Sequence, residues 1–496
     1  MGVLIPRLVI AGLSGDSGKT IASLSLVTAL RQRGLAIAAF KKGPDFIDPA
    51  WLAQASGGVC RNLDTFMVDP SDVFATFVSH APDSDVAVVE GNRGLYDGSD
   101  VSGTHSTAQL AKLIKAPVVL VVNATKVTRT VAALVKGCQV FDPEVRIAGV
   151  ILNKVSGTRH REIISKAIET YCNLPVVGAI PKLGEDASLI PGRHLGLVPP
   201  AEFGAREEYE SKLIEIARDY LDIDKILEIA KDTEPLEPVE APAGIKAGKD
   251  VRIGYFSDTA FTFYYPENLE RLEESGAELV PVSSLEESDL PEIDGLYIGG
   301  GFPETHAARL AQNSALMDDV KRVADAGMPI FAECGGLIYL SRTLTWRGNR
   351  HRMAGVFPID LDMTKRPSGH GYSELVCDKT NPFFDLGAVV RGHEFHYSKP
   401  AESGSDCETC FQVKKGVGVG GERDGLLYRS TLASYTHIHA DGVRSWADKF
   451  VHAARGYREN RMQSDQADDS EREHSRRRQT LKKTNSIRDE RHPAIY

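Results

Sequence analysis

The chain has 496 residues, 42% of them hydrophobic and 25% charged, and a formal net charge of −10 at pH 7. This length is enough for two or three domains, and the composition is typical of soluble globular proteins. The acidic balance argues against a nucleic-acid-binding protein, and no apolar run approaches the roughly 20 residues that cross a bilayer. An anionic substrate would therefore have to meet locally placed basic groups.

Seven cysteines are spread along the chain. Their odd number and wide spacing favour a reducing compartment, and we expect a cytoplasmic protein. Cys407 and Cys410 form a single CxxC without a second pair, so the pattern does not predict a metal site there. The N-terminus lacks the charged region of a signal peptide and passes directly into an apolar strand.

The first motif is a glycine-containing loop between an apolar strand and a helical run, within residues 4–33. Backbone N–H groups of such a loop wrap phosphates, the Lys19 ammonium reaches the β and γ oxygens, and the Thr20 hydroxyl suits Mg²⁺. The spacing departs from the usual pattern, because Leu13 stands where the first glycine is expected. This longer loop resembles the one in dethiobiotin-synthetase-like nucleotide-binding folds. The candidate ATP-binding residues are Gly15, Gly18, Lys19 and Thr20.

A second polar loop, at residues 41–49, carries two lysines and two carboxylates. A solvated turn would explain these charges, but it would not explain the apolar Phe46 and Ile47 between the two aspartates. We predict that Asp45 and Asp48 position or activate a substrate. Asp45 is also a candidate ligand of Mg²⁺, directly or through water.

A buried-type strand at residues 85–90 ends on Glu90. A carboxylate at the C-terminal end of a strand beside a phosphate loop is where a Mg²⁺-directing group belongs. Asp97, in the loop that follows, is a further candidate for substrate activation. Asn153, at the end of a later strand, could contact a nucleotide base or simply cap the strand end. Strands and helices alternate to about residue 201, which predicts a doubly wound parallel α/β sheet.

A second α/β unit opens near Val251, after a segment rich in Pro, Glu and Ala. Within it, the apolar run at 329–332 leads to Cys334, two glycines and a helix-compatible segment. Such a strand–turn–helix elbow exposes a nucleophile, and the helix N-terminus would favour the thiolate. The alternative is a buried structural cysteine. The glycines at 299–301 could offer N–H groups to an oxyanion, or form a simple tight turn.

These motifs together identify the chain as resembling the cobyrinic acid a,c-diamide synthase family, over about residues 5–455. The resemblance implies a P-loop synthetase domain followed by a class I glutamine amidotransferase-like domain. The matching motifs are GLSGDSGKT, KKGPDFIDP, RNLD, EGNRGLYDG, GVILNKV, RHLGLV, AFTFYYPENL, GGGFPE, AECGGLIYL, GHEFHYS and ASYTHIHA.

The resemblance implies a glutamine-hydrolysing carbon–nitrogen ligase of cobalamin biosynthesis. Glutamine is then hydrolysed at Cys334, ATP with Mg²⁺ activates acetate carboxylates of a tetrapyrrole polycarboxylate, and the released ammonia forms the amides. A cysteine nucleophile needs a base, and His437 matches the family's position. His439 lies on the same face of an extended chain, whereas His393 and His396 fit substrate-side or structural roles. No Glu stands two residues after His437, so we predict a Cys–His pair.

Two departures keep alternatives open. Asn92-Arg93 stands where two apolar residues are more common in the family, and the segment Asn123 to Lys126 also differs from the commonest form, so the acceptor could be another tetrapyrrole. A sirohaem amidase associated with sulfite reductase and a nickel-sirohydrochlorin a,c-diamide synthase share the same reaction. An alternative from another class is a P-loop switch ATPase with a degenerate second domain, although Ser14 stands where that class often has a lysine. A homodimer is one option, since the sequence does not give the oligomeric state.

The pattern predicts four segments. The last of them has mixed charge and almost no large apolar residues, which is typical of disorder. The predicted segments are an ATP-binding synthetase domain at 1–225, a linker at 226–250, a glutaminase domain at 251–457 and a disordered tail at 458–496.

Overall fold

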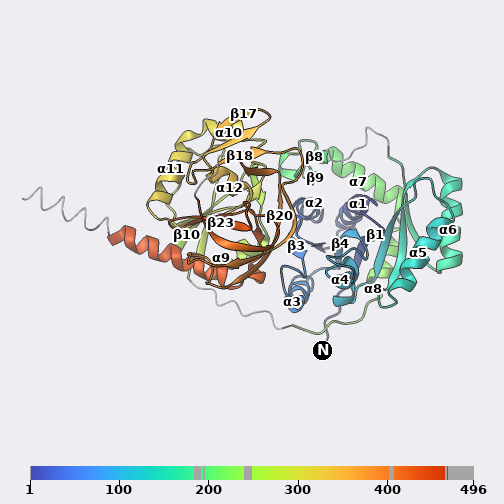
Figure 1. Cartoon of the computed structure of the whole chain (residues 1–496). Coiled ribbons are helices and arrows are strands. Elements are labelled where there is room, and N and C mark those ends of the chain that lie inside the picture. The colour runs from blue at the N-terminus through green and yellow to red at the C-terminus, as the bar shows by residue number, and fades with distance from the viewer. Residues whose placement is uncertain are drawn as a thin grey trace, which may run out of the picture.

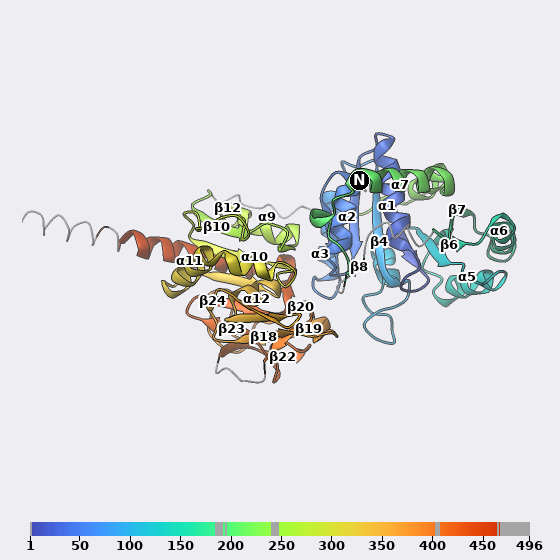
Figure 2. The same cartoon turned by 90° about the horizontal axis from the view of Figure 1, so that it is seen from above.

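The computed structural model describes residues 2–183, 192–193, 196–239, 248–401, 407–463 and 466. Two α/β units lie side by side, the N-terminal one blue to green and the C-terminal one yellow to red (Figure 1). The view from above shows the same two bodies (Figure 2). The predicted fold class, a parallel P-loop domain followed by an amidotransferase-like α/β domain, is confirmed.

The N-terminal unit is built on a seven-stranded sheet of order β3-β2-β4-β1-β5-β6-β7, in which every pairing is parallel. Most of its strands are rich in Val, Ile and Leu, as expected for a sheet that helices cover on both faces. The strands are β1 (Arg7–Gly12), β2 (Ile37–Lys42), β3 (Cys60–Leu63), β4 (Val86–Gly94), β5 (Val118–Asn123), β6 (Ile147–Val155) and β7 (Val176–Pro181), with a small hairpin of β8 (Gly192–Arg193) and β9 (Gly196–Leu197).

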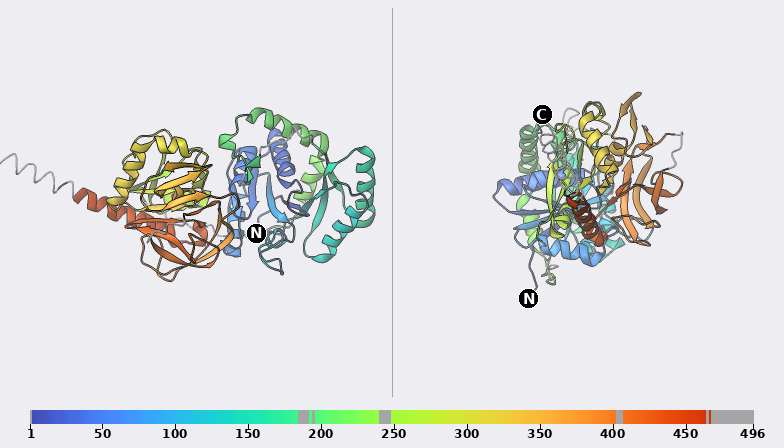
Figure 3. Two further views of the ribbon diagram at one scale, coloured as in Figure 1. Left: turned by 45° about the horizontal axis from the view of Figure 1, so that its top comes forward. Right: turned by 90° about the vertical axis from the view of Figure 1, so that its left-hand side faces the viewer.

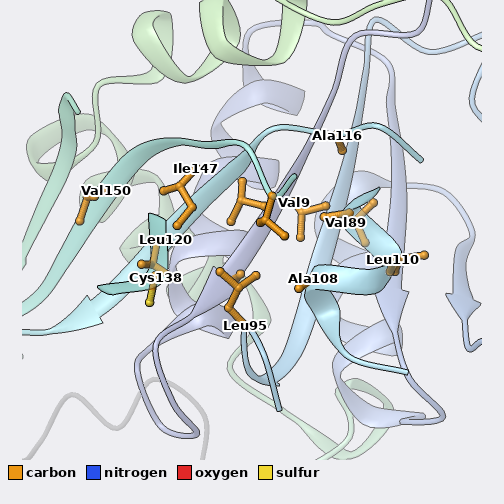
Figure 4. Close-up of a cluster of buried hydrophobic side chains, with 14 of the residues drawn as sticks. Val9, Val89, Leu95, Ala108, Leu110, Ala116, Leu120, Cys138, Ile147 and Val150 are labelled. Carbon is orange, nitrogen blue, oxygen red and sulfur yellow. The ribbon is translucent and has the colours of Figure 1, made fainter. Parts of the chain in front are cut away.

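Helices pack on the two faces of this sheet in two groups, as a doubly wound fold requires. One face is covered by α3 (Pro70–His80), α4 (Thr107–Leu113), α5 (Thr130–Phe141) and α6 (Thr158–Cys172). The other is covered by α1 (Lys19–Gln32), α2 (Ile47–Ser56), α7 (Arg206–Tyr220) and α8 (Ile223–Lys231). Figure 4 shows the first of these cores, where Val9, Val89 and Leu120 project from neighbouring strands.

The C-terminal unit has a ten-stranded mixed sheet of order β12-β10-β13-β15-β24-β23-β22-β19-β20-β25. The half from β12 to β24 is parallel and the rest antiparallel. The strands are β10 (Val251–Phe256), β12 (Ala277–Val282), β13 (Gly295–Ile298), β15 (Ile330–Glu333), β19 (Gly369–Cys377), β20 (Val389–His396), β22 (Glu408–Lys415), β23 (Arg423–Tyr428), β24 (Thr431–Ser434) and β25 (His437–Ile438).

Helices again cover both faces of the parallel half. They are α9 (Pro266–Glu274), α10 (Ala307–Gln312), α11 (Ser314–Asp325), α12 (Gly335–Leu340) and a helix over 445–463. Two smaller sheets complete the unit. They contain β11 (Phe261–Phe263) with β14 (Gly300–Gly301), and β16 (Thr343–Trp346), β17 (Asn349–Arg352), β18 (Asp360–Met363) and β21 (Ser398–Pro400).

The segment boundaries differ in detail from the predicted ones. Helix α8 continues past residue 226, and Val3 bridges to Leu236, so the start of the expected linker belongs to the N-terminal unit. The helix over 445–463 continues past residue 458, where Arg461 pairs with Asp294 at 3.2 Å. Figure 3 shows this helix, in red, on the side of the C-terminal unit that faces away from the N-terminal unit. Residues 240–247 of the linker and 467–496 of the tail lie outside the described residues.

Direct polar contacts join the two units. The Arg61 guanidinium, on β3, donates to Glu267 at 3.0 Å and to Glu270 at 2.7 Å, both on α9. The Tyr372 hydroxyl, on β19, donates to Asp64 at 2.7 Å. These bonds fix the carboxyl edge of the N-terminal sheet against the C-terminal unit. Of the described helices, none has the length and apolar character needed to cross a membrane.

Candidate active site

The predicted cysteine elbow is present. Strand β15 ends at Glu333, Cys334 has φ 46° and ψ −93°, and α12 begins at Gly335. A positive φ is rare for a residue with a side chain and marks the strained turn on which nucleophiles are presented. A Cβ at Gly336 would lie 2.3 Å from the carbonyl oxygen of Ile298, so the turn needs a glycine there.

The thiol environment differs from the expected one. Cys334 is 7% exposed, and burial together with the Glu304 and Glu333 carboxylates raises the pKa of its thiol well above the usual range. The Gly335 N–H favours the thiolate, as predicted for a helix N-terminus, but its effect is smaller. The resting nucleophile is therefore a protonated thiol, and it needs a base to react.

His437 is the predicted base. It lies on β25, is 2% exposed, and pairs across the sheet with His393. A Cβ on Gly300 would lie 2.5 Å from His437 Cε1, and one on Gly335 would lie 3.0 Å from the Gly301 nitrogen. The Gly300–Gly301 segment therefore fits between the imidazole and the elbow.

Glu333, which the sequence analysis did not single out, lies beside His437. Its Oε2 lies 3.8 Å from His437 Nδ1 and accepts the Tyr297 hydroxyl at 2.9 Å. Its Oε1 accepts the Ile438 N–H at 2.8 Å. The side chain is 1% exposed, and His437 Nδ1 is buried without a hydrogen-bond partner among the described residues. A buried carboxylate thus faces the nitrogen opposite the one that would serve the thiol.

The other histidines have separate partners. His439 Nε2 lies 3.5 Å from the Glu267 carboxylate. Burial of the imidazole lowers the pKa of His439, but the hydrogen bond and charge of Glu267 outweigh burial, so the pKa is raised. His396 donates from Nδ1 to the Ser398 carbonyl oxygen at 2.8 Å and stacks on Tyr435. His393 stacks on His437 with ring centroids 4.9 Å apart, and burial lowers its pKa well below the usual value.

The phosphate loop forms a second candidate centre. Gly18 has φ 96° and precedes α1, which begins at Lys19. The Lys19 ammonium folds back onto the carbonyl oxygens of Ser14 at 3.2 Å and Arg93 at 2.7 Å. Asn153 donates to the Ser17 carbonyl at 2.9 Å, so its amide braces this loop. Gly15 has open space around its Cα, as a loop that closes over phosphates requires.

Glu90 and Thr20 are brought together as predicted. The Thr20 hydroxyl donates to Glu90 Oε1 at 2.9 Å, and Glu90 Oε2 is buried without a hydrogen-bond partner in the described structure. Lys41 lies between two acids, with Nζ 2.8 Å from Glu90 and 2.6 Å from Asp48. Although burial opposes a charge, these carboxylates raise the pKa of Lys41, and Lys41 lowers that of Asp48.

The other predicted aspartates have local structural roles in this conformation. Asp45 accepts the N–H groups of Ile47 at 3.1 Å and Asp48 at 3.2 Å, at the start of α2. Burial, with the neighbouring Asp48 carboxylate, raises the pKa of Asp45 to about 7. Asp97 accepts the Gly94 N–H at 2.8 Å and is exposed. Asp45 does not contact Thr20 or Glu90, so the three predicted Mg²⁺ ligands do not form one cluster in the described residues.

A cavity of about 650 Å³ is lined by residues of both units. Asp45 and Asp97 line it from the N-terminal unit, and His437 lines it from the C-terminal unit. The Cys334 thiol is directed to the carbonyl oxygen of Phe395 at 4.0 Å, and Phe395 is also part of the cavity wall. A molecule in this cavity would touch the aspartate loop and the imidazole at once.

Comparison with known proteins agrees with both halves of this arrangement. Residues 8–195 match the CobQ/CobB/MinD/ParA nucleotide binding domain, and residues 252–444 match the CobB/CobQ-like glutamine amidotransferase domain. A solved glutamine amidotransferase aligns with 42% of this chain and 97% of its own, at 18% identity and a TM-score of 0.30, too distant to add to the argument.

Curated relatives cover nearly the whole chain. The cobyrinate a,c-diamide synthase of Magnetococcus marinus is 44% identical over 449 residues, which is 89% of this chain and 96% of the relative. That of Archaeoglobus fulgidus is 41% identical over 452 residues, 91% of this chain and 98% of the relative. Both domains are therefore present in the order and at the length of these enzymes. The chain belongs to the cobyrinate a,c-diamide synthase family of glutamine-hydrolysing ligases.

Proposed function

We propose that this protein uses ATP and glutamine to amidate the a- and c-acetate carboxylates of cobyrinate in cobalamin biosynthesis. The observation that carries the proposal is that the same cavity is lined by Asp45 and Asp97 of the N-terminal unit and by His437 of the C-terminal unit. An acceptor held there would have its carboxylate beside the phosphate-loop unit and its nitrogen source beside the glutaminase unit. The names of the relatives, all cobyrinate a,c-diamide synthases among those compared above, support cobyrinate as the acceptor.

In the glutaminase half, the Cys334 sulfur attacks the carboxamide carbon of glutamine while the thiol proton passes to His437. The resulting oxyanion is held by backbone N–H groups near Gly300 and Gly301. His437 then gives its proton to the leaving nitrogen, so that ammonia departs and a thioester remains. Water, activated by the same imidazole, hydrolyses the thioester to glutamate. Glu333, whose carboxylate lies 3.8 Å from Nδ1, stabilises the imidazolium that forms twice in this cycle.

In the synthetase half, an acetate oxygen attacks the γ-phosphorus of ATP, giving an acyl phosphate and ADP. Ammonia then attacks the acyl carbon, which yields the amide and releases phosphate. Both reactants of the first step are anionic, so Lys19 and Lys41 must offset their repulsion. Asp45 and Asp48 position the acetate, and the second acetate is amidated in a second cycle.

Mg²⁺ would be held by the Thr20 hydroxyl and by the unpartnered Oε2 of Glu90. These two donors fit an ion that keeps several waters and binds substrate phosphates, rather than an ion enclosed by protein ligands. When bound, Mg²⁺ neutralises charge on the β- and γ-phosphates. Asp45 would join the site only by turning away from the N–H groups that it accepts at the start of α2.

The reaction fits the cytoplasm, because all seven cysteines are free thiols. The proposal is tested by incubating the purified chain with ATP, Mg²⁺, glutamine and one acceptor at a time, followed by mass spectrometry. The acceptors are cobyrinate, sirohaem and nickel-sirohydrochlorin. We expect two successive losses of about 1 Da, each O-to-NH exchange on an acid, with cobyrinate as the fastest acceptor. Faster amidation of another acceptor would reassign the ring system, and glutamine-independent ATP turnover without amides would favour a switch ATPase.

A further inference from the structure

A buried lysine without a partner lies in the wall of the interdomain cavity. Lys42 is 6% exposed and lines the cavity, yet no hydrogen bond or ion pair joins its ammonium to any other described residue. Its neighbour Lys41, equally buried, is paired with two carboxylates. A buried charge left unpaired is costly, so such a group is retained where a ligand completes it.

Two further cations reach the same cavity. Arg93 lines it, is exposed, and has no ion pair with a described carboxylate. Its backbone has φ 50°, and its carbonyl oxygen accepts the Lys19 ammonium, so the phosphate loop holds this residue in place. Lys415 comes from the other unit and lies over the Phe66 ring at 4.9 Å, also without a described carboxylate partner.

The carboxylates in this wall are largely engaged by other groups. Glu394 accepts the N–H groups of Val417 and Gly418, the latter at 2.9 Å. Asp97 accepts the Gly94 N–H. Burial lowers the pKa of Lys42, with Arg93 adding to this effect and Asp64 opposing it. Asp45, Asp97 and Glu394 also line the cavity, but no ion pair joins any of these carboxylates to Lys42, Arg93 or Lys415 in the described residues, so the three cations can meet an anionic ligand.

We propose that Lys42, Arg93 and Lys415 form a binding site for the non-reacting carboxylates of the acceptor. The inference rests on the proposed function, since it assigns the groups that hold the acceptor while one acetate is activated. Carboxylates suit this site because three separated cations from two units match a ring with several peripheral acids. The triphosphate, by contrast, has its own cradle at Lys19 and Lys41. The carbonyl contact between Arg93 and Lys19 links the acceptor site to that cradle.

The experiment measures the KM for cobyrinate with ammonia as the nitrogen source and saturating ATP. Charge-assisted hydrogen bonds contribute about 1.5–3 kcal/mol, so removing one should raise this KM by roughly 10- to 100-fold. We expect this rise in the KM for cobyrinate in Lys42→Gln, and a smaller rise of about 3- to 10-fold in Arg93→Gln, whose side chain is more exposed. In both variants the KM for ATP should stay within about twofold of the parent value. Lys42→Arg should restore part of the affinity. Lys249→Gln, at an exposed lysine paired with Glu273, is the matched control with unchanged kinetics.

A second arm varies the ligand. Cobyrinate esterified at its propionates should bind more weakly than cobyrinate to the parent enzyme. If Lys42 contacts one of these propionates, esterification should raise the KM less in Lys42→Gln than in the parent enzyme, because the variant has already lost that contact. An unchanged KM for cobyrinate in folded Lys42→Gln and Arg93→Gln would overturn the inference, as would a rise confined to the KM for ATP. Arg93→Gln decides the matter if Lys42→Gln fails to fold. Failure of the parent enzyme to amidate cobyrinate would instead refute the proposed function.

Discussion

Replacing Glu333 with Gln tests the glutaminase centre most directly. The substitution keeps the shape of the side chain and removes the negative charge 3.8 Å from His437 Nδ1. Two unit charges at this separation interact by about 4 kcal/mol at an effective dielectric constant of about 20. At about 1.4 kcal/mol per factor of ten, the full loss would slow the reaction ~10³-fold. Because the Gln dipole can still accept from Ile438, we expect glutamine hydrolysis to fall by about 10²- to 10³-fold.

The assay is glutamate release, compared with amidation driven by added ammonia on the same preparation. The second reaction does not use the imidazole, so it should stay within about twofold. Tyr297→Phe removes one donor to Glu333 but leaves its charge, so it should cost less than about tenfold. A Glu333→Gln enzyme with glutaminase activity within threefold of the parent would refute the role assigned to this carboxylate.

Four further results are expected at the residues predicted from sequence. Cys334→Ser should abolish glutamine hydrolysis and spare ammonia-driven amidation, and loss of both activities would contradict the division between the two units. His437→Ala should lower glutaminase activity by about 10²- to 10⁴-fold. A larger loss of this activity in His439→Ala would instead assign the general base to His439. Lys19→Ala should remove amidation even with excess ammonia. Burial and Asp48 raise the pKa of Asp45 to about 7, so ammonia-driven amidation should change as Asp45 ionises through neutral pH, and Asp45→Asn should lack that inflection.

The elements that the sequence predicts best are those with a local cause. The strand–turn–helix at Cys334 is dictated by the glycines that the turn requires and by the apolar run before it. The parallel sheet follows from buried runs of β-branched residues that alternate with helices. The phosphate loop is equally local, because Gly18, Lys19 and Thr20 are contiguous at the start of α1.

The features that the sequence did not predict depend on contacts between distant segments. Glu333 stands next to the nucleophile, but its function is visible only when β25 brings His437 beside β15. A rule based on spacing looked for an acid two residues after His437, where the chain has His439. The side chains that line the cavity have the same origin, since Lys42 and Lys415 are 373 residues apart in the sequence. The one clue available was Glu333 itself, a charged residue ending a buried strand.

Contacts with the C-terminal unit explain why apolar residues lie between Asp45 and Asp48. The Phe46 ring stacks on Phe263 at a centroid distance of 5.0 Å and lies 5.1 Å from the His437 ring. The same loop is fixed from the far side, where the Tyr265 hydroxyl donates to the Pro44 carbonyl at 2.7 Å. One short loop thus carries the acids of the synthetase centre and an aromatic wall for the glutaminase base.

This arrangement predicts that the Phe46 ring keeps glutamine hydrolysis coupled to amide formation. Phe46→Ala would leave a gap beside His437, through which ammonia escapes and water enters before the acyl phosphate is ready. We expect the glutamate released per amide formed to rise from about 1 to several, while ammonia-driven amidation changes little because Asp45 keeps its backbone contacts. Phe141→Ala is the matched control, since Phe141 packs on Tyr96 within the N-terminal unit at a centroid distance of 4.9 Å and neither residue lines the cavity. A ratio that stays at 1 in Phe46→Ala would show that the ring serves only to pack the two units together.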